Sequence, residues 1–218
     1  MAKAKVLIAT PTSTMLVSRT AAWREATSYK AVTNEEFDGL PAIAEGRPVD
    51  YVRNGFCRMF LQMPDITHLF LLDSDVEPPL DCIERLLALN VPLATGCYPV
   101  LMQHGLRWAL SNMHEDRRYR LLERLDSETE PFEVDAGGAG CLMIRRDVIE
   151  KIKWPWFRWI ENEDGSQVSE DIFFFKKCNF AGLRVTVDPQ VICNHYKLTN
   201  LTALMRAKMK NRKDSQCG

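Results

Sequence analysis

A run of apolar residues that ends in two aspartates most constrains how this chain can fold. Residues 67–80 read THLFLLDSDVEPPL, in which the apolar run 68–72 leads directly to Asp73 and Asp75. Such a run predicts a buried strand, and Pro79 suits the start of a following helix. Two carboxylates this close repel each other unless a positive charge lies beside them. The pattern therefore predicts a buried strand with an acidic pair at its end and a cation nearby.

Strand-like and helix-like segments alternate along the rest of the chain. Runs that predict buried strands lie at 5–10, 91–100 and 183–189. Segments that predict helices lie at 15–26, 50–63, 79–90 and 169–182. Residues 135–152 combine a glycine-rich turn, a strand and a helix. This alternation predicts an α/β fold, with a mainly parallel central sheet flanked by helices, in one domain over residues 1–198.

Four segments carry more irregular patterns. Residues 27–33 (TSYKAVT) could form a second strand, and residues 34–49, which contain glycines and prolines, indicate a polar loop. The stretch 106–134 mixes alternating and charged residues, which favours a small region of β-ribbons with a long polar connection. Residues 199–218 are rich in lysine and arginine and predict a basic C-terminal helix or tail.

The composition is typical of a soluble globular protein and excludes several broad classes. The 218 residues carry a net charge of −1 and are 46% hydrophobic, so no global charge attracts nucleic acid or a membrane. No apolar run is long enough for a secretory signal or a membrane span. Seven cysteines without a CxxC pair argue against a disulfide framework or a zinc knuckle. These features predict a cytoplasmic protein without a transmembrane segment.

The aspartate pair is the first candidate for chemistry. Asp73 and Asp75 leave the chain on the same side, two residues apart, and ligands of open α/β sheets bind at the carboxyl ends of the strands. Carboxylate oxygens are preferred ligands of Mg²⁺ and Mn²⁺, which complete their shells with water and phosphate oxygens. The pair therefore favours a divalent metal site, with a surface turn held by side-chain hydrogen bonds as the structural alternative.

Three further segments could contribute to the same site. Residues 169–171 (SED) open a helix, where acids either favour the helix dipole or supply a general base. His195 follows an apolar run and is either a packed residue or a further metal ligand. Gly137 and Gly138 would let the backbone approach a ligand closely. The glycines lack the spacing of a dinucleotide-binding fingerprint, and the sequence contains no P-loop motif.

These segments follow one another in an order that resembles the GT-A glycosyltransferases. The matching motifs are, in order, KVLIATPT, VRNG, LFLLDSDV, GGAGCLMIRRDV, SEDIFFF and NHY, and they span residues 5–196. The sequence looks similar to enzymes related to family 2, including short phage and bacterial forms. The resemblance implies a Rossmann-like GT-A fold and a metal-dependent transfer of a sugar. The donor would be a nucleotide sugar, in particular a UDP-sugar, and an acceptor hydroxyl would attack. The resemblance favours inversion at the anomeric carbon, although some related GT-A enzymes retain configuration with similar motifs.

The resemblance also implies roles for individual residues. Asp75 would bind Mn²⁺ or Mg²⁺ directly, Asp73 would bind the donor ribose or a metal-bound water, and His195 would supply a further metal contact. Asp171 would be the catalytic base that takes the acceptor proton, with Glu170 orienting or replacing it. The remaining donor-binding positions are Thr10, Pro11, Thr12, Arg53, Asn54, Ser74, Asp135, Gly137 and Gly138.

Alternatives stay open for some roles, for the acceptor and for the reaction. Trp156 and Phe157 are either core residues or a platform that faces the acceptor, and Arg53 and Asn54 could simply brace their helix. The acceptor could be a glycan, a lipid-linked sugar or a hydroxymethylated DNA base, with the basic tail docking on an anionic membrane surface or on DNA. The competing hypotheses are a nucleotidyltransferase that makes the nucleotide sugar and a sugar-nucleotide-binding module without activity.

Overall fold

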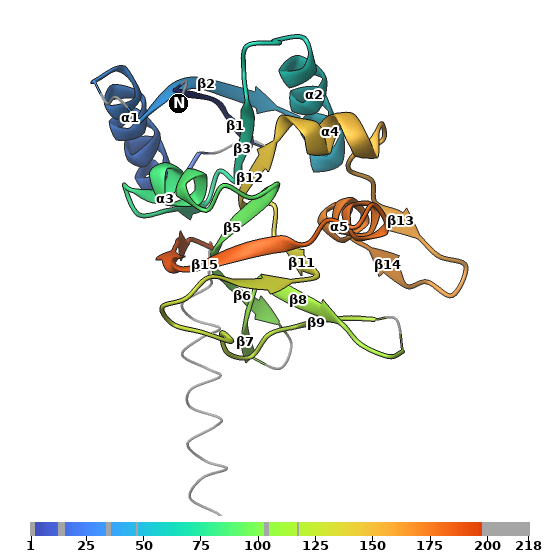
Figure 1. Cartoon of the computed structure of the whole chain (residues 1–218). Helices are drawn as coiled ribbons and strands as arrows, with labels where there is room; N and C mark the ends of the chain where they lie inside the picture. Colours follow the sequence, from blue (N-terminus) through green and yellow to red (C-terminus); the bar gives the residue numbers. More distant parts are fainter. Residues whose placement is uncertain are drawn as a thin grey trace, which may run out of the picture.

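The central feature of the computed structural model is a seven-stranded sheet (Figure 1). The structure describes residues 3–12, 16–33, 36–46, 48–102, 105–116 and 118–197, so the predicted basic tail at 199–218 lies outside it. In spatial order, the sheet contains β10 (Phe132–Val134), β15 (Val185–Ile192), β5 (Leu93–Cys97), β12 (Cys141–Arg145), β3 (His68–Leu72), β1 (Ala4–Thr12) and β2 (Phe37–Glu45).

Five strands of this sheet run in one direction and two run against them. β1 pairs in parallel with both β2 and β3, and β5 pairs in parallel with β15. β12 lies antiparallel between β3 and β5, so these two strands point the same way, and β10 is an antiparallel edge strand. The prediction of an α/β fold with a mainly parallel sheet is confirmed. The carboxyl ends of β1, β3, β5 and β15 therefore meet at one edge.

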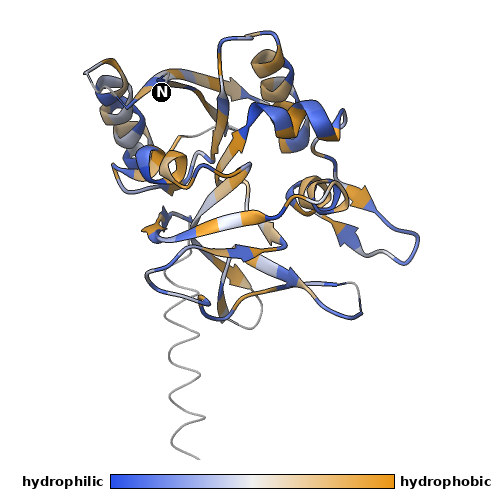
Figure 2. Cartoon of the chain, viewed as in Figure 1, coloured by the Kyte–Doolittle hydropathy of each residue, from blue (hydrophilic) through white to orange (hydrophobic). Residues whose placement is uncertain are grey.

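Helices cover both faces of the sheet (Figure 1). One face carries α2 (Val49–Leu61), α4 (Arg146–Ile152) and α5 (Glu170–Phe180), and the other carries α1 (Ser18–Thr33) and α3 (Cys82–Ala88). Because side chains alternate along a strand, Leu7 and Leu71 join the core of the first face, whereas Ile8 and Phe70 join that of the second. Figure 2 shows that hydrophobic residues predominate along the central strands.

Smaller β elements extend the structure beside the carboxyl edge, as expected for the β-ribbon region. A three-stranded sheet consists of β8 (Leu110–Met113), β9 (Tyr119–Leu121) and β11 (Ala136–Gly137). Three two-stranded pairs are β6 (Pro99–Met102) with β7 (Gly105–Trp108), β13 (Ile160–Glu161) with β14 (Gln167–Val168), and β4 (Val76–Glu77) with β16 (Asn194–His195). The β4–β16 pair places residues 194–195, near the end of the described chain, beside the segment that follows β3.

The prediction of a strand at residues 27–33 is wrong, because this segment is the second half of α1. Thr20, Trp23, Thr27 and Ala31 are buried, and their spacing of three to four residues places them on one face of a helix. The β-branched residues of the segment suggest a strand locally. The helical spacing that begins nearer the N-terminus decides the conformation.

The prediction of a loop at residues 34–49 is also wrong, since β2 occupies most of that stretch. Within the described residues β2 pairs only with β1, so it is an edge strand. Pro41 lacks a backbone N–H and Gly39 weakens a strand, but an edge position tolerates both. A Cβ atom on Gly39 would lie 2.8 Å from the Cβ atom of Ala31. The glycine thus allows α1 to pack closely on β2.

The described residues also bear on membrane insertion and on thiol chemistry. None of the helices described is long and apolar enough to cross a bilayer. The six described cysteines are free and buried. The Sγ atoms of Cys82 and Cys141 lie 3.7 Å apart.

Candidate functional site

The candidate site lies at the edge of the sheet where the parallel strands end. Asp73 and Asp75 follow β3, and Tyr98 follows β5. β12 runs the other way, so the glycine-rich turn before it, residues 137–140, reaches the same edge. The pairing of β16 with β4 brings His195 next to the segment that follows Asp75. Residues that are far apart in the sequence are therefore neighbours here.

A buried arginine from α2 joins two acids of this site. Arg53 donates from Nη2 to Asp73 Oδ1 at 2.6 Å and from Nη1 to Glu170 Oε1. Burial lowers the pKa of Arg53, but attraction to Asp73, Glu170 and Asp171 outweighs it, so the pKa is raised above its ordinary value. Burial raises the pKa of Glu170, and Arg53 opposes this only in part. Arg53 is thus a fixed positive charge within an acidic cluster.

Asp75 faces a histidine and a lysine. Its Oδ2 atom lies 3.6 Å from His195 Nε2 and 2.6 Å from Lys197 Nζ. Burial raises the pKa of Asp75, but the nearby His195 ring and the hydrogen bond from Lys197 Nζ outweigh burial and hold the pKa below its ordinary value. Burial lowers the pKa of His195, yet Asp75 and the Pro99 carbonyl group raise it overall. These contacts keep Asp75 in its charged form.

The hydrogen bonding of His195 suits a metal ligand. Its Nδ1 atom lies 2.7 Å from the Pro99 carbonyl oxygen, which can only accept, so Nδ1 carries the hydrogen. In the neutral ring Nε2 then keeps its lone pair, and this is the atom that faces Asp75. The third predicted ligand, Asp73, points to Arg53 instead.

Two protein donors alone do not complete a metal site. Among the described residues, no group of three or more His, Cys, Asp or Glu side chains is arranged to hold an ion. The donor set at this edge is Asp75 and His195, one hard oxygen and one imidazole nitrogen. Mg²⁺ and Mn²⁺ accept such a set when water or substrate oxygens fill the other positions. The residues therefore fit an ion that binds together with a phosphate-bearing ligand.

An open cavity of about 720 Å³ lies in front of the acidic cluster. Five of the predicted donor-binding residues line it, namely Pro11, Thr12, Arg53, Asp73 and Ser74. Asp75, Glu170 and Lys197 line it as well. The cavity thus brings together residues from β1, α2, the end of β3 and the start of α5.

A second cavity, of about 320 Å³, contains Asp171. Gly137, Gly138 and Tyr98 are among its lining residues. A Cβ atom on Gly138 would lie 1.9 Å from Tyr98 Oη, so the close approach of the turn to the tyrosine requires glycine. Asp171 Oδ1 accepts hydrogen bonds from Ser169 Oγ and, at 2.7 Å, from the backbone N–H of the next residue. The carboxylate is therefore fixed at the wall of this cavity.

Gly140 lies between a residue of the larger cavity and a residue of the smaller one. A Cβ atom on Gly140 would lie 2.9 Å from Asp73 Oδ2 and 2.9 Å from Tyr98 Oη, which line the first and second cavity respectively. Glu170 and Asp171 are adjacent in sequence but open into different cavities, Glu170 into the larger and Asp171 into the smaller. The sequence alone does not separate the roles of these two acids. In the structure the two side chains have different surroundings, because they line different cavities.

Asn54, Trp156 and Phe157 form a buried structural unit. The Asn54 amide donates at 2.7 Å to each of the carbonyl oxygens of Asp50 and Phe157, and accepts from the backbone N–H groups of Trp156 and Phe157. Trp156 and Phe157 are 4% and 0% exposed and belong to the core. This placement favours bracing for Asn54 and core packing for the two aromatic residues over a platform for the acceptor.

Thr10 and Asp135 line neither cavity described above. Thr10 is fully buried, and its Oγ1 atom accepts a hydrogen bond from Arg24 Nη1. Asp135 accepts a hydrogen bond of 2.8 Å from the backbone N–H of Met113 and pairs with Arg184 at 3.2 Å. Both residues therefore support the elements around the site, in the positions where the structure places them.

Tyr98 and Lys197 are site residues that sequence analysis does not predict. Tyr98 Oη accepts a hydrogen bond of 3.0 Å from Gly140 N, and its ring contacts His195 edge-on with centroids 5.2 Å apart. Burial raises the pKa of Tyr98, and the charges of Asp73 and Asp171 add to this. Its position directly after a buried strand is the signal that could identify it. Lys197 has no comparable signal, because its contact with Asp75 depends on the β4–β16 pairing.

Comparison with known proteins supports the fold. No protein-family model matches the sequence, and no curated protein matches it. A197 from STIV is similar in structure, with a TM-score of 0.56 and 19% sequence identity over 89% of this chain and 86% of that one. GalNAc-T7, crystallised with UDP, GalNAc and Mn²⁺, has a TM-score of 0.57 and 11% identity over 90% of this chain and 44% of its own. At such identities the likeness shows the fold alone, and it confirms the predicted GT-A fold.

Proposed function

We propose that this chain is a metal-dependent glycosyltransferase that moves a sugar from a UDP-sugar to an acceptor hydroxyl, with inversion at the anomeric carbon. The observation that carries the proposal is the presence of two cavities at the carboxyl edge of a GT-A sheet, one lined by Asp73, Asp75 and Glu170 and the other by Asp171. A nucleotide sugar in the larger cavity and an acceptor hydroxyl in the smaller one would meet beside Gly140. The GT-A likeness supports this use of the edge, since GalNAc-T7 was crystallised with UDP and Mn²⁺.

The larger cavity has the groups that a nucleoside diphosphate needs. Pro11, Thr12 and Ser74 line its walls and would contact the nucleoside. Asp75 lines the cavity, and His195, which does not line it, lies with Nε2 3.6 Å from Asp75 Oδ2. The two side chains would hold a Mn²⁺ or Mg²⁺ ion, which stabilises the negative charge of a departing diphosphate when bound. Arg53 keeps Asp73 in place at the same edge.

Asp171 is the proposed base. The proton of the acceptor hydroxyl passes to the Asp171 carboxylate while the acceptor oxygen bonds to the anomeric carbon. The bond from that carbon to the diphosphate oxygen breaks, and the nucleoside diphosphate leaves with the electron pair. Glu170 faces the larger cavity and is paired with Arg53, so it is a positioning residue.

Nucleotide binding and turnover test this function separately. The wild type should bind UDP with Mn²⁺, and Asp75→Asn should lose the Mn²⁺-dependent part, whereas Asp65→Asn, at an exposed position outside the site, should not. Asp171→Asn should keep UDP binding but release UDP from UDP-sugars about 10²–10⁴-fold more slowly. Wild-type protein that binds no nucleotide with Mn²⁺, or an Asp171→Asn variant with normal rate, would contradict the proposal. Release of pyrophosphate from a nucleoside triphosphate would support a nucleotidyltransferase instead.

A further inference from the structure

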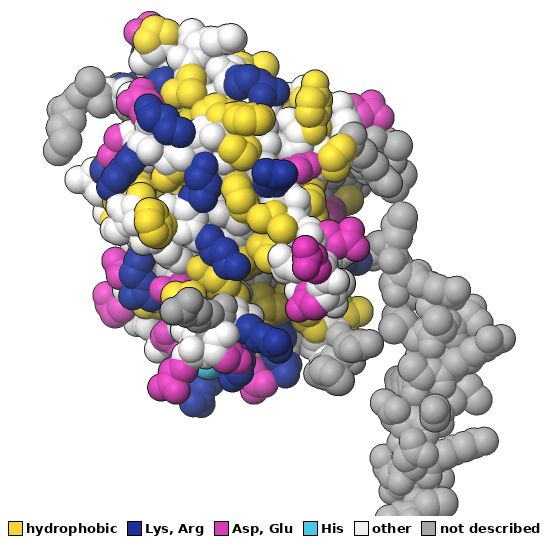
Figure 3. All heavy atoms as spheres, turned by 90° about the vertical axis from the view of Figure 1, so that its right-hand side faces the viewer, with side chains coloured by type: hydrophobic (Ala, Val, Ile, Leu, Met, Phe, Trp, Pro, Cys, Tyr) yellow, Lys and Arg dark blue, Asp and Glu magenta, His cyan; other side chains and the backbone are white. Residues whose placement is uncertain are grey.

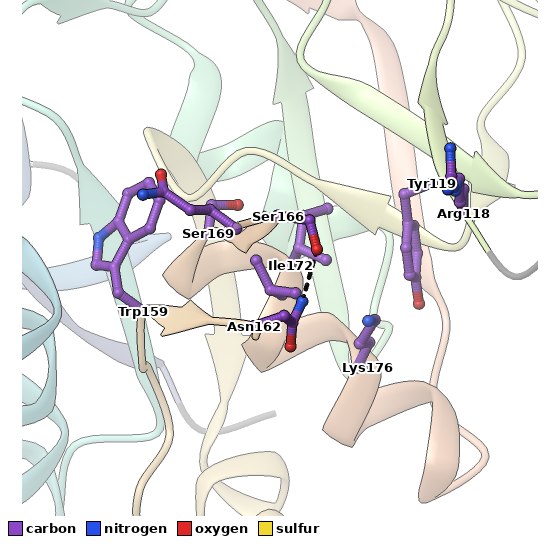
Figure 4. A pocket seen from close by; sticks show the side chains of 10 residues that line it. Arg118, Tyr119, Trp159, Asn162, Ser166, Ser169, Ile172 and Lys176 are labelled. Atoms are coloured by element: carbon purple, nitrogen blue, oxygen red, sulfur yellow. Dashed lines mark hydrogen bonds between the residues drawn. The ribbon is translucent and has the colours of Figure 1, made fainter. Parts of the chain in front are cut away.

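A third cavity, of about 560 Å³, lies beside α5 (Figure 4). Tyr119, Ser169 and Ile172 line this cavity and also the smaller cavity that contains Asp171. Ser169, Ile172 and Lys176 follow one another at intervals of three and four residues, so they lie on one face of α5. The two cavities therefore form one groove, called here the α5 groove, which leads from Asp171 along about 10 Å of the helix.

Aromatic rings form opposite walls of the α5 groove. Figure 4 shows Trp159 on one side of the cavity and Tyr119 on the other. Trp159 is 46% exposed, unlike the buried Trp156. Tyr119 is fixed by Asn179 of α5, whose Nδ2 atom donates to the tyrosine hydroxyl at 3.1 Å. Flat faces held apart in this way suit a ring with an apolar surface between them.

The charged groups of the third cavity are both cationic. Arg118 and Lys176 line the part of the groove that the third cavity forms, and no acidic residue lines that part. Asp171 lies at the other end, in the smaller cavity. Lys176 Nζ lies 5.9 Å from the centre of the Tyr119 ring. In the part of the chain that the structure describes, no carboxylate lies within ion-pair distance of the Arg118 or Lys176 side chain, although Asp116 and Asp164 lie close enough to feel the charge of Arg118. The face that carries α5 and the β13–β14 hairpin shows basic, acidic and hydrophobic side chains interspersed (Figure 3).

We propose that the α5 groove binds the acceptor, and that Arg118 and Lys176 select a saccharide that carries an acidic group, a carboxylate or a phosphate. The inference rests on the proposed function, because it assigns the acceptor of the same reaction. An anionic group would give the two cations the ion-pair partner that they lack, and Trp159 and Tyr119 would offer their apolar faces to the sugar. A duplex nucleic acid fits less well, since it needs a stripe of basic residues along its phosphates rather than two cations in a bounded cavity.

Binding of three simple sugars tests the selection by charge. Isothermal titration calorimetry should show that the wild type binds glucuronate and glucose 6-phosphate more tightly than glucose. The tighter binder of the two acidic sugars shows whether the groove prefers a carboxylate or a phosphate. The Arg118→Gln/Lys176→Gln variant should bind both acids about tenfold more weakly, close to glucose. Trp159→Ala should lower the affinity for all three sugars by the same factor. Arg58→Gln removes an exposed positive charge from α2 and should change nothing.

Several outcomes would overturn the inference. They are equal wild-type affinity for glucose and the acids, no binding of any of the three sugars, or unchanged affinity for the acids in the double variant. Tighter binding of a short single-stranded DNA, lost in the double variant, would assign the groove to nucleic acid instead. UDP binding with Mn²⁺, measured on the same proteins, keeps the two proposals apart. If the wild type binds acidic sugars through Arg118 and Lys176 but binds no UDP, the transferase function fails while the ligand class of the groove stands.

Discussion

Replacing Arg53 with methionine should destabilise the protein through the acid that is left behind. Arg53→Met keeps most of the side-chain volume, but Glu170, whose side chain is 7% exposed, loses its cation. Removing one partner of a buried ion pair costs about 3–5 kcal/mol, because an uncompensated charge stays in a medium of low dielectric constant. Glu170 can limit this cost by taking up a proton, since burial already raises its pKa. We therefore expect the free energy of unfolding to fall by ~3 kcal/mol at pH 8.

Proton uptake gives this effect a pH dependence with a definite sign. Without Arg53, the native pKa of Glu170 rises further above its ordinary value of 4.5. Between these two values the native state holds a proton that the unfolded state has released, so the free energy of unfolding decreases as the pH rises. The free energy of unfolding is highest at pH values below the ordinary pKa of Glu170, and it becomes constant at pH values above the native pKa. The deficit of Arg53→Met relative to the wild type should thus be smaller at pH 5 than at pH 8.

Urea unfolding at both pH values measures the effect. Arg58→Met, at an exposed position of the same helix, is the matched control and should change the free energy of unfolding by less than about 0.5 kcal/mol. The double variant Arg53→Met/Glu170→Gln removes both charges and should recover ~2 kcal/mol of the loss. A loss below about 1 kcal/mol at pH 8, or no recovery in the double variant, would refute the argument that Arg53 neutralises a buried Glu170.

Two other changes test the close approach at the glycine-rich turn and the cation beside Asp75. Gly138→Ala should destabilise the protein by roughly 1–3 kcal/mol, because the new Cβ atom would lie 1.9 Å from Tyr98 Oη. Gly55→Ala, with no atom within 4 Å of its Cβ position in α2, should be neutral or stabilising, and equal thermal unfolding of the two variants would contradict the packing argument. Lys197→Ala should raise the affinity for Mn²⁺ about two- to fivefold, since the ammonium group competes for Asp75 Oδ2. An unchanged or lower affinity in a calorimetric titration would show that the lysine does not compete with the ion.

Most of the fold could be predicted because its signals are local. The apolar run of β3, the helical spacing in α2 and α5 and the glycine-rich turn before β12 each express themselves within a few residues. β2 could not be recognised, because Gly39 and Pro41 contradict a strand unless the strand is known to lie at an edge of the sheet. Edge position is a property of the assembled sheet, and it is absent from the segment itself.

Some residues of the site could likewise be predicted from the sequence and others could not. Asp73 and Asp75 could be predicted as a pair because they follow a buried strand, and the order of the motifs draws attention to His195. The link from Arg53 to Glu170 joins residues 117 positions apart, and no spacing rule predicts it. For the same reason the sequence does not show that Asn54 holds buried backbone groups. Roles that depend on which elements touch thus require the structure.

Helix geometry and charge balance together explain why two adjacent acids have different surroundings. Successive side chains of a helix are rotated by about 100°, so Glu170 and Asp171 in the first turn of α5 open into different cavities. Arg53 neutralises the side that faces the donor cavity, and Asp171 stays free of a cationic hydrogen-bond partner among the described residues. Around this edge of the sheet two cations, Arg53 and Lys197, lie among the four carboxylates of Asp73, Asp75, Glu170 and Asp171. A diphosphate would add further negative charge. A donor of this class can therefore bind there only if more positive charge arrives with it, and a divalent ion between Asp75 and His195 would supply that charge.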